Sequence, residues 1–200
     1  MKIGVIGVGR LGQDCAEVMA ENGHEVSGYD INPFDSDSIT QVETIEELVK
    51  DKQYVFVSVP TPHDPAYDGS TPAMHLEPKD FDYTLAKSVI AEADTYMNDT
   101  QSIILISTVM PGTIRNQIIP LVTNTKFVYN PYLIAMGTIR WDMVNPEMIM
   151  IGTEDGSKTG LASDLSFFYS SFMDNNPRTV IGTWEEIETM TIFYNTFIST

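Results

Sequence analysis

The chain has 200 residues, of which 42% are hydrophobic, enough to bury one good core in one domain with or without an appendage. Acidic residues outnumber basic ones 28 to 11, and the net charge of −17 argues against nucleic-acid and anionic membrane partners. No apolar run approaches the ~20 residues that cross a bilayer, and no signal peptide is recognisable. The single cysteine excludes an intrachain disulfide, and we expect a cytoplasmic protein.

Short apolar runs alternate with helical patterns along most of the chain. Strands are expected at residues 2–7, 25–30, 54–59, 102–107, 126–129, 148–152 and 179–182. Helices are expected from the first glycines to residues 22–23, at 44–50, at 82–96, after 111–113, from 158 and from 184. Strands this apolar are buried on both faces, which predicts a doubly wound parallel sheet, an α/β fold of the Rossmann type. We expect this domain to span residues 1–183.

The last predicted helix, residues 184–200, has the pattern of an association surface. Its apolar stripe consists of Ile187, Met190, Tyr194, Phe197 and Ile198, and no Gly, Asn or Pro stop signal follows. Either the helix is truncated or it docks on something else, and we expect residues 184–200 to form an association surface, the start of a central dimerisation helix, through which the chain makes a homodimer.

The loop of about twenty residues after the third predicted strand is long for a compact domain, and such loops are usually functional or mobile. It contains His63, His75, Asp64 and Asp68, whose spacing matches no metal template. We expect a solvated loop and no metal site. Cys15 lies on the apolar face of the first helix and is expected to be a core residue.

The turn Gly7-Val8-Gly9-Arg10-Leu11-Gly12 links the first strand to the first helix. In a G-x-G-x-x-G turn the first glycine permits a tight bend, the second lets the backbone approach a pyrophosphate, and the third lets the helix sit close to the strand. Free N–H groups at the helix start favour an anion, and Arg10 either reaches it or remains solvated. The motif therefore predicts a dinucleotide site.

Asp30 ends the second predicted strand, close to the ~20-residue spacing after the glycines that is typical of the acid that binds the adenosine ribose. A carboxylate at this place also repels a 2′-phosphate. The cofactor is therefore expected to be NAD(H) and not NADP(H).

Further motifs resemble the UDP-glucose 6-dehydrogenase family and its GDP-mannose relatives. They are the glycine turn, Tyr29-Asp30-Ile31-Asn32, Val57-Ser58-Val59-Pro60-Thr61-Pro62, Ser107-Thr108-Val109-Met110-Pro111-Gly112-Thr113, Asn130-Pro131, Gly137-Thr138 through Asp142, Pro146, Ile149-Met150-Ile151-Gly152 and Asn195-Thr196-Phe197. The resemblance covers nearly the whole chain, and its most specific part is the Ser-Thr-Val-x-Pro-Gly-Thr segment.

In that family an NAD domain is followed by a dimerisation helix and a second domain that binds the nucleotide sugar, which is oxidised twice through a cysteine adduct. The resemblance implies that Thr61 and Thr108 lie beside the ribose and nicotinamide, with Thr108 near the catalytic water. The expected cofactor site comprises Gly7, Gly9, Arg10, Leu11, Gly12, Asp30, Ile31, Val59, Pro60, Thr61 and Thr108. The expected catalytic positions are Thr108 and Asn195.

Several family positions are substituted. Tyr132 and Met136 stand where the family has glutamates, which leaves Tyr132 as the acid–base candidate, and Thr191 replaces the oxyanion lysine. The nucleophilic cysteine belongs to a second domain that this chain does not have. The leading hypothesis is thus the NAD-binding half of a nucleotide-sugar dehydrogenase-like protein, inactive by itself. The alternatives are a non-catalytic NAD(H)-binding regulatory or scaffold module and another Rossmann dehydrogenase, such as a β-hydroxyacid type.

Overall fold

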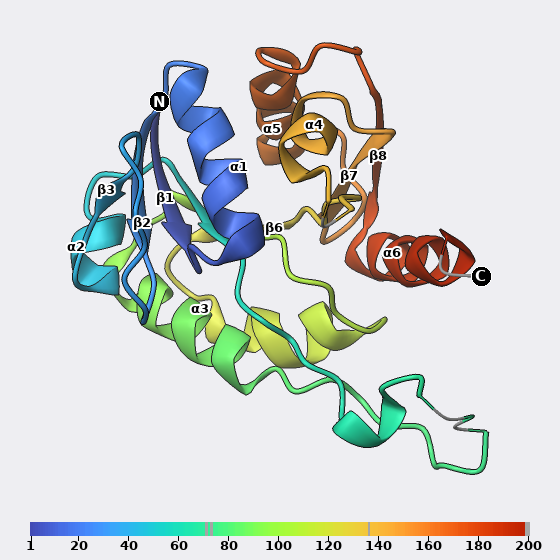
Figure 1. Ribbon diagram of the computed structural model, residues 1–200. Helices are drawn as coiled ribbons and strands as arrows, with labels where there is room; N and C mark the ends of the chain where they lie inside the picture. The colour runs from blue at the N-terminus through green and yellow to red at the C-terminus, as the bar shows by residue number, and fades with distance from the viewer. Residues whose placement is uncertain (71, 73, 136, 199–200) are drawn as a thin grey trace.

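The computed structural model describes residues 1–70, 72, 74–135 and 137–198, the last without its side chain. These residues form one eight-stranded sheet in the order β3-β2-β1-β4-β5-β6-β7-β8 (Figure 1). The strands are β1 (Lys2–Ile6), β2 (Glu25–Tyr29), β3 (Thr40–Gln41), β4 (Tyr54–Val57), β5 (Ser102–Leu105), β6 (Lys126–Tyr129), β7 (Met148–Thr153) and β8 (Arg178–Thr183). The helices are α1 (Arg10–Glu21), α2 (Ile45–Val49), α3 (Thr84–Tyr96), α4 (Ile139–Val144), α5 (Leu161–Ser170) and α6 (Trp184–Ile198), with short turns η1 (Pro65–Tyr67), η2 (Ile114–Ile118) and η3 (Ile119–Leu121).

The expected doubly wound α/β architecture is confirmed, and the predicted strands are all present. β3 and α4 were not expected from the sequence, because both are too short for a periodic pattern. The helix expected after Pro111 is a π-helical turn, η2, followed by the 3₁₀ turn η3. Pro120 lies in η3 and has no N–H to continue an α-helical ladder, which accounts for the change of helix type.

One strand pair departs from the expected parallel sheet. β7 runs antiparallel to β6, and the two share a single register pair, Tyr129 with Gly152. A parallel pair would need a crossover that returns the chain to the start of β6. Here the chain turns back beyond the carboxyl end of β6, so β7 runs toward that end in the opposite direction. β7 and β8 therefore extend beyond the carboxyl edge of the first six strands.

Helices cover both faces of the sheet, and side chains alternate between two cores. Ile3, Val5 and Phe56 pack in the core under α1, α4 and α5. Val55 and Val57 pack in the opposite core with residues of α2, α3, η2 and α6. Because both faces are covered, all four residues of β4 are buried, as the apolar runs predicted.

Ion pairs also join α4 to α1, which pack on the same core. Arg140 on α4 lies 3.0 Å from the Glu17 carboxylate and 2.5 Å from that of Glu21, both on α1. Exposed ion pairs of this kind each contribute at most about 1 kcal/mol. They hold α4 against α1 in addition to the shared core.

The apolar stripe of α6 does not form one exposed surface, which corrects the expectation from the sequence. Ile187 is completely buried, and Met190 packs against the core under α2 and α3. Tyr194 is half-buried and donates to Glu147. The exposed aromatic side chains of this helix are Phe193 and Phe197, and the side chain of Ile198 lies outside the described residues. The first half of α6 therefore belongs to the domain's own core, because β7 and β8 need cover on that face.

The segment between β4 and α3 extends away from the body of the domain (Figure 1). It is held within itself by an ion pair between Lys79 and Asp64 and by a hydrogen bond from Tyr67 to the carbonyl of Glu77. Within the described parts of the chain, no cluster of His, Cys, Asp or Glu side chains is placed to hold a metal ion. In the same parts, no helix is long and apolar enough to span a membrane.

Candidate functional site

The three glycines of the turn after β1 have three different surroundings. Gly7 has φ +91°, and a Cβ there would lie 2.4 Å from the carbonyl oxygen of Ser58. A Cβ on Gly12 would lie 1.9 Å from the carbonyl oxygen of Gly7, so α1 can approach the turn only because Gly12 has no side chain. A Cβ on Gly9 would meet nothing within 4 Å. Gly7 and Gly12 are thus required by packing, and Gly9 faces open space.

That open space is a cleft of about 770 Å³ at the carboxyl ends of β1, β2, β4 and β5. The strand order reverses between β1 and β4, and open α/β sheets bind their ligands at such a switch point. Its lining contains every expected cofactor residue: Gly7, Gly9, Arg10, Leu11, Gly12, Asp30, Ile31, Val59, Pro60, Thr61 and Thr108. Asn195 does not line it but lies half-buried on α6.

Asp30 and Arg10 are the two charged side chains among the described residues that line the cleft. The Asp30 carboxylate accepts a hydrogen bond of 2.8 Å from the backbone N–H of Asn32 through Oδ1. This contact orients the carboxylate and leaves Oδ2 available to a ligand. The role of Asn32 was missed from the sequence, although Asp-x-Asn after a strand is a common turn signal. Arg10 is exposed at the first residue of α1, where it meets the cleft.

The opposite end of the cleft is built from the loops that follow β4 and β5. Thr61 donates a 2.6 Å hydrogen bond from Oγ1 to the carbonyl oxygen of Thr108. Ser107 donates one of the same length to the carbonyl oxygen of Val59. These crossed bonds hold the two loops together and place both threonines in the cleft wall.

An apolar wall of the cleft comes from α3, which the sequence analysis did not assign to the site. Leu85 is 40% exposed, and Val89 lies one helical turn further on. Their spacing of four residues puts both on one face of the helix, which is the signal that could have identified them.

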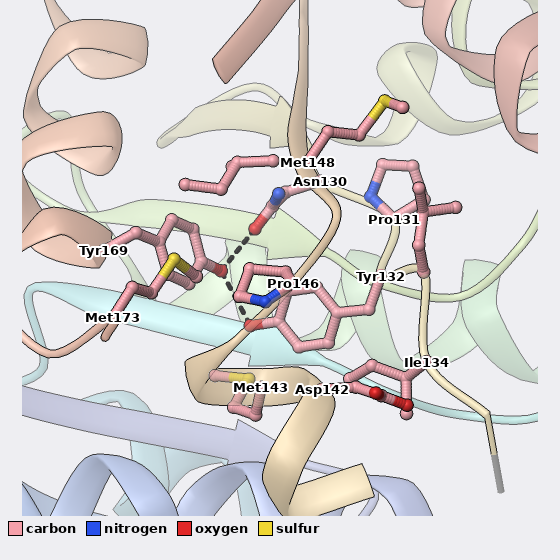
Figure 2. Close-up of a pocket in the computed structure, with 12 residues that line it drawn as sticks. Asn130, Pro131, Tyr132, Ile134, Asp142, Met143, Pro146, Met148, Tyr169 and Met173 are labelled. Atoms are coloured by element: carbon pink, nitrogen blue, oxygen red, sulfur yellow. Dashed lines mark hydrogen bonds between the residues drawn. The ribbon is translucent and has the colours of Figure 1, made fainter. Parts of the chain in front are cut away.

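Tyr132 is half-buried beside the core under α1 and lines a pocket with Asn130 and Tyr169, and its role as the acid–base candidate stays a prediction. Its hydroxyl lies 2.6 Å from that of Tyr169, which in turn donates to Oδ1 of Asn130 (Figure 2). Burial raises the pKa of Tyr132 well above its usual value. The side chain is turned toward the core, because Tyr169 and Asn130 satisfy its hydroxyl there.

The substituted position Thr191 and the single cysteine, Cys15, are both buried. Thr191 has no exposed surface, and its Oγ1 donates to the carbonyl of Ile187 one turn earlier on α6. Cys15 is 1% exposed, as expected of a core residue, and burial raises the pKa of its thiol. Met136 lies outside the described residues.

Two family models match the chain. Residues 34–173 match the UDP-glucose/GDP-mannose dehydrogenase family, NAD binding domain. Residues 2–60 match the 3-hydroxyacyl-CoA dehydrogenase, NAD binding domain. The chain belongs to the UDP-glucose/GDP-mannose dehydrogenase family. It is an NAD-binding domain of nucleotide-sugar dehydrogenase type, and the observation that Gly9 opens onto the cleft fits that cofactor.

The chain is also similar to curated relatives, and its fold is similar to solved structures. GDP-mannose 6-dehydrogenase of Pseudomonas putida is 24% identical over 78% of this chain and 42% of the relative. An uncharacterized protein of Methanocaldococcus jannaschii is 27% identical over the whole chain and 24% of its own length. The fold matches GDP-mannose dehydrogenase from Pseudomonas aeruginosa with a TM-score of 0.82, at 21% identity, over 100% of this chain and 50% of that one. It matches a UDP-glucose dehydrogenase from Pyrobaculum islandicum with a TM-score of 0.78, at 20% identity, over 98% and 49%. The chain thus spans half or less of the length of these proteins.

The different surroundings of Gly9 and Gly12 give a paired prediction. Gly12→Ala forces a methyl group into the Gly7 carbonyl and should lower the free energy of unfolding by about 3 kcal/mol or more. Gly9→Ala should change it by less than about 0.5 kcal/mol but weaken NADH binding, because its methyl group enters the cleft. Urea unfolding and NADH fluorescence titration measure the two effects. A Gly9→Ala variant that binds NADH like the wild type would contradict the placement of the cofactor.

Proposed function

We propose that the cleft holds NAD(H) in one orientation, with its pyrophosphate on the first turn of α1. The adenosine ribose lies against Asp30 and Ile31, and the nicotinamide lies between Thr61 and Thr108. The observation that carries this proposal is that one cleft at the switch point contains all the residues expected for the cofactor. The domain would be the cofactor half of a protein that oxidises a nucleotide sugar with a second domain.

The charges of the site support this orientation. The pyrophosphate is an anion, and the free N–H groups and dipole at the start of α1 stabilise it. Arg10 adds a positive charge at the same end, in a chain whose net charge is −17. Asp30 lies on β2's side of the cleft, where neutral ribose hydroxyls can donate to Oδ2.

Asp30 provides the experiment that tests this proposal. Calorimetry should show that the wild type binds NAD(H) more tightly than NADP(H). Asp30→Ala should weaken NAD binding by about 1–3 kcal/mol, because the ribose hydroxyls lose their acceptor. The control is Asp37→Ala, which removes an exposed carboxylate outside the cleft lining and should leave both affinities unchanged. Equal or tighter NADP binding by the wild type would refute the role of Asp30.

We further propose that this chain by itself does not oxidise a nucleotide sugar. Family chemistry needs a base, a cation at the oxyanion and a thiolate. Tyr132 is hydrogen-bonded to Tyr169 beside the core, Thr191 is uncharged and bonded to its own helix, and Cys15 is buried on the inner face of α1. These contacts favour a domain that binds NAD(H) without turnover, whether as half of a larger enzyme or as a regulatory module.

The matching prediction is that NAD and UDP-glucose yield no NADH with this chain, measured by absorbance. The loss of one oxyanion-stabilising group alone costs about 10²–10³ in rate, and the losses here need not add. A full-length relative with an intact set of catalytic residues is the positive control. Steady NADH formation that disappears in Thr108→Ala would contradict this prediction.

The N-terminal match to the 3-hydroxyacyl-CoA dehydrogenase model does not favour a β-hydroxyacid dehydrogenase. It covers residues 2–60, which contain the glycine turn and Asp30 but none of the loops after β5. These first elements are common to many dinucleotide-binding domains.

A cytoplasmic location is proposed from the single, buried cysteine.

We propose a homodimer through the second half of α6. Phe193 is 71% exposed and Phe197 is 81% exposed, whereas the first half of the helix is covered. Large exposed aromatic side chains on one helix are typical of an interface.

Sedimentation velocity should therefore show a dimer of the wild type at high concentration. A double variant, Phe193→Ser with Phe197→Ser, should sediment as a monomer. Phe167→Ser is the control, since Phe167 is 77% exposed on α5 and should not affect the dimer. A monomeric wild type at all concentrations would refute the dimer.

A further inference from the structure

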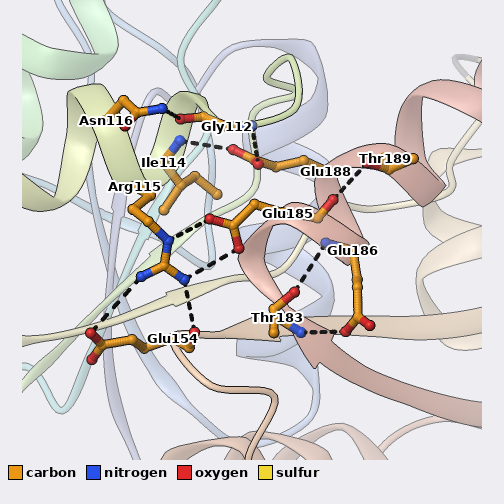
Figure 3. A network of polar contacts seen from close by, with 10 residues as sticks. All are labelled: Gly112, Ile114, Arg115, Asn116, Glu154, Thr183, Glu185, Glu186, Glu188 and Thr189. Carbon is orange, nitrogen blue, oxygen red and sulfur yellow. Dashed lines mark hydrogen bonds and ion pairs between the residues drawn. The ribbon is translucent and has the colours of Figure 1, made fainter.

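Glu188 on α6 is a carboxylate with no exposed surface. It accepts a 2.6 Å hydrogen bond from the backbone N–H of Gly112 and a 2.8 Å bond from that of Ile114 (Figure 3). Burial raises the pKa of Glu188, and the two amide bonds oppose that rise. A buried carboxylate is costly without such partners, so the side chain and the turn it binds depend on each other.

The turn that Glu188 binds continues from the wall of the cleft. Thr108 lines the cleft, and Gly112 follows four residues later with φ +89°, a conformation that leaves its N–H pointing at the carboxylate. Between them, the N–H of Met110 donates to the hydroxyl of Tyr83 over 3.0 Å. The backbone after Thr108 is thus held by side chains from α6 and from the start of α3.

Glu188 is not needed merely to attach α6 to this part of the fold. Arg115 on η2 forms an ion pair with Glu185 on α6 at 2.5 Å (Figure 3). It also lies 4.9 Å from the centre of the Trp184 ring. Ile187 packs in the shared core. What Glu188 adds is the orientation of two backbone amides in the turn that follows Thr108.

We propose that Glu188 is a positioning residue for the cofactor, which fixes Thr108 at the nicotinamide end of the cleft through the 108–114 backbone. This inference rests on the proposed function, because it takes the nicotinamide to lie beside Thr108. The path is continuous: Glu188 holds Gly112 and Ile114, and the carbonyl of Thr108 is held by Thr61 from the other side. Without the carboxylate, the 108–114 backbone loses its hydrogen bonds to α6, whereas the glycine turn before α1 is unchanged.

The test compares two ligands, NADH and ADP-ribose, which has the adenosine, pyrophosphate and second ribose but no nicotinamide. In Glu188→Gln the amide group presents an N–H to one of the two backbone donors. The variant should bind NADH about tenfold more weakly, equivalent to one lost hydrogen bond. Its affinity for ADP-ribose should stay within about twofold of the wild type, because the glycine turn and Asp30 are untouched. The fluorescence of bound NADH should also move toward that of free NADH.

Glu185→Gln is the matched control, with the same substitution on the same helix and a partner on the same turn. It should leave the affinity for both ligands unchanged. If Glu188→Gln does not fold, Glu188→Asp replaces it, since the shorter carboxylate keeps the charge but cannot reach both amides. It should show the same loss for NADH alone.

The outcomes separate the two proposals. Equal loss of both ligands in the Glu188 variant indicates a structural role only and overturns the inference, as does unchanged NADH binding. A wild type that binds neither ligand refutes the proposed function and this inference with it. A wild type that binds both, with a selective loss of NADH in the variant, supports it.

Discussion

The cofactor cleft depends on how closely the first turn of α1 approaches the backbone that leaves β1. A methyl group on Gly12 would lie 1.9 Å from the Gly7 carbonyl, and one on Gly7 would lie 2.4 Å from the Ser58 carbonyl. Because neither glycine has a side chain, β1, β4 and α1 can approach one another closely around this turn. Only then do the free amides of α1 point into the space that Gly9 leaves open, between Asp30 on one side and Thr108 on the other.

The far end of the cleft is positioned by polar contacts between loops in addition to the packing of Val59 and Val109 in the core. Thr61, Ser107 and Glu188 each use a side-chain oxygen to bind the backbone of another segment. Such bonds fix backbone direction, which a packed methyl group cannot do, and buried ones are costly to break. On the other face of the sheet, Tyr132, Tyr169 and Asn130 form a chain of hydrogen bonds between their side chains.

The local patterns of the sequence predicted which residues meet in the cleft, because the glycine turn, Asp30 and the two threonines each follow a buried strand and reach one edge of the sheet. The rest depended on contacts between distant segments. Glu188 binds amides 74 and 76 residues earlier, and no periodicity distinguishes it from the half-buried Glu185 and the exposed Glu186 on the same helix. The inward turn of Tyr132 depends on Tyr169, and the reversed direction of β7 depends on where the chain after Asn130 can return. The stripe of α6 was read as exposed because helical spacing does not tell a core face from an interface.

The central claim is that NAD lies across this cleft with its pyrophosphate on α1 and its nicotinamide at Thr108. A crystal structure of the chain with NAD tests it most directly. The account predicts hydrogen bonds from the amides at the start of α1 to the pyrophosphate, from the adenosine ribose to Oδ2 of Asp30, and the nicotinamide ring within contact of Thr61 and Thr108. A cofactor bound elsewhere, or in this cleft with its nicotinamide at Asp30, would contradict the account.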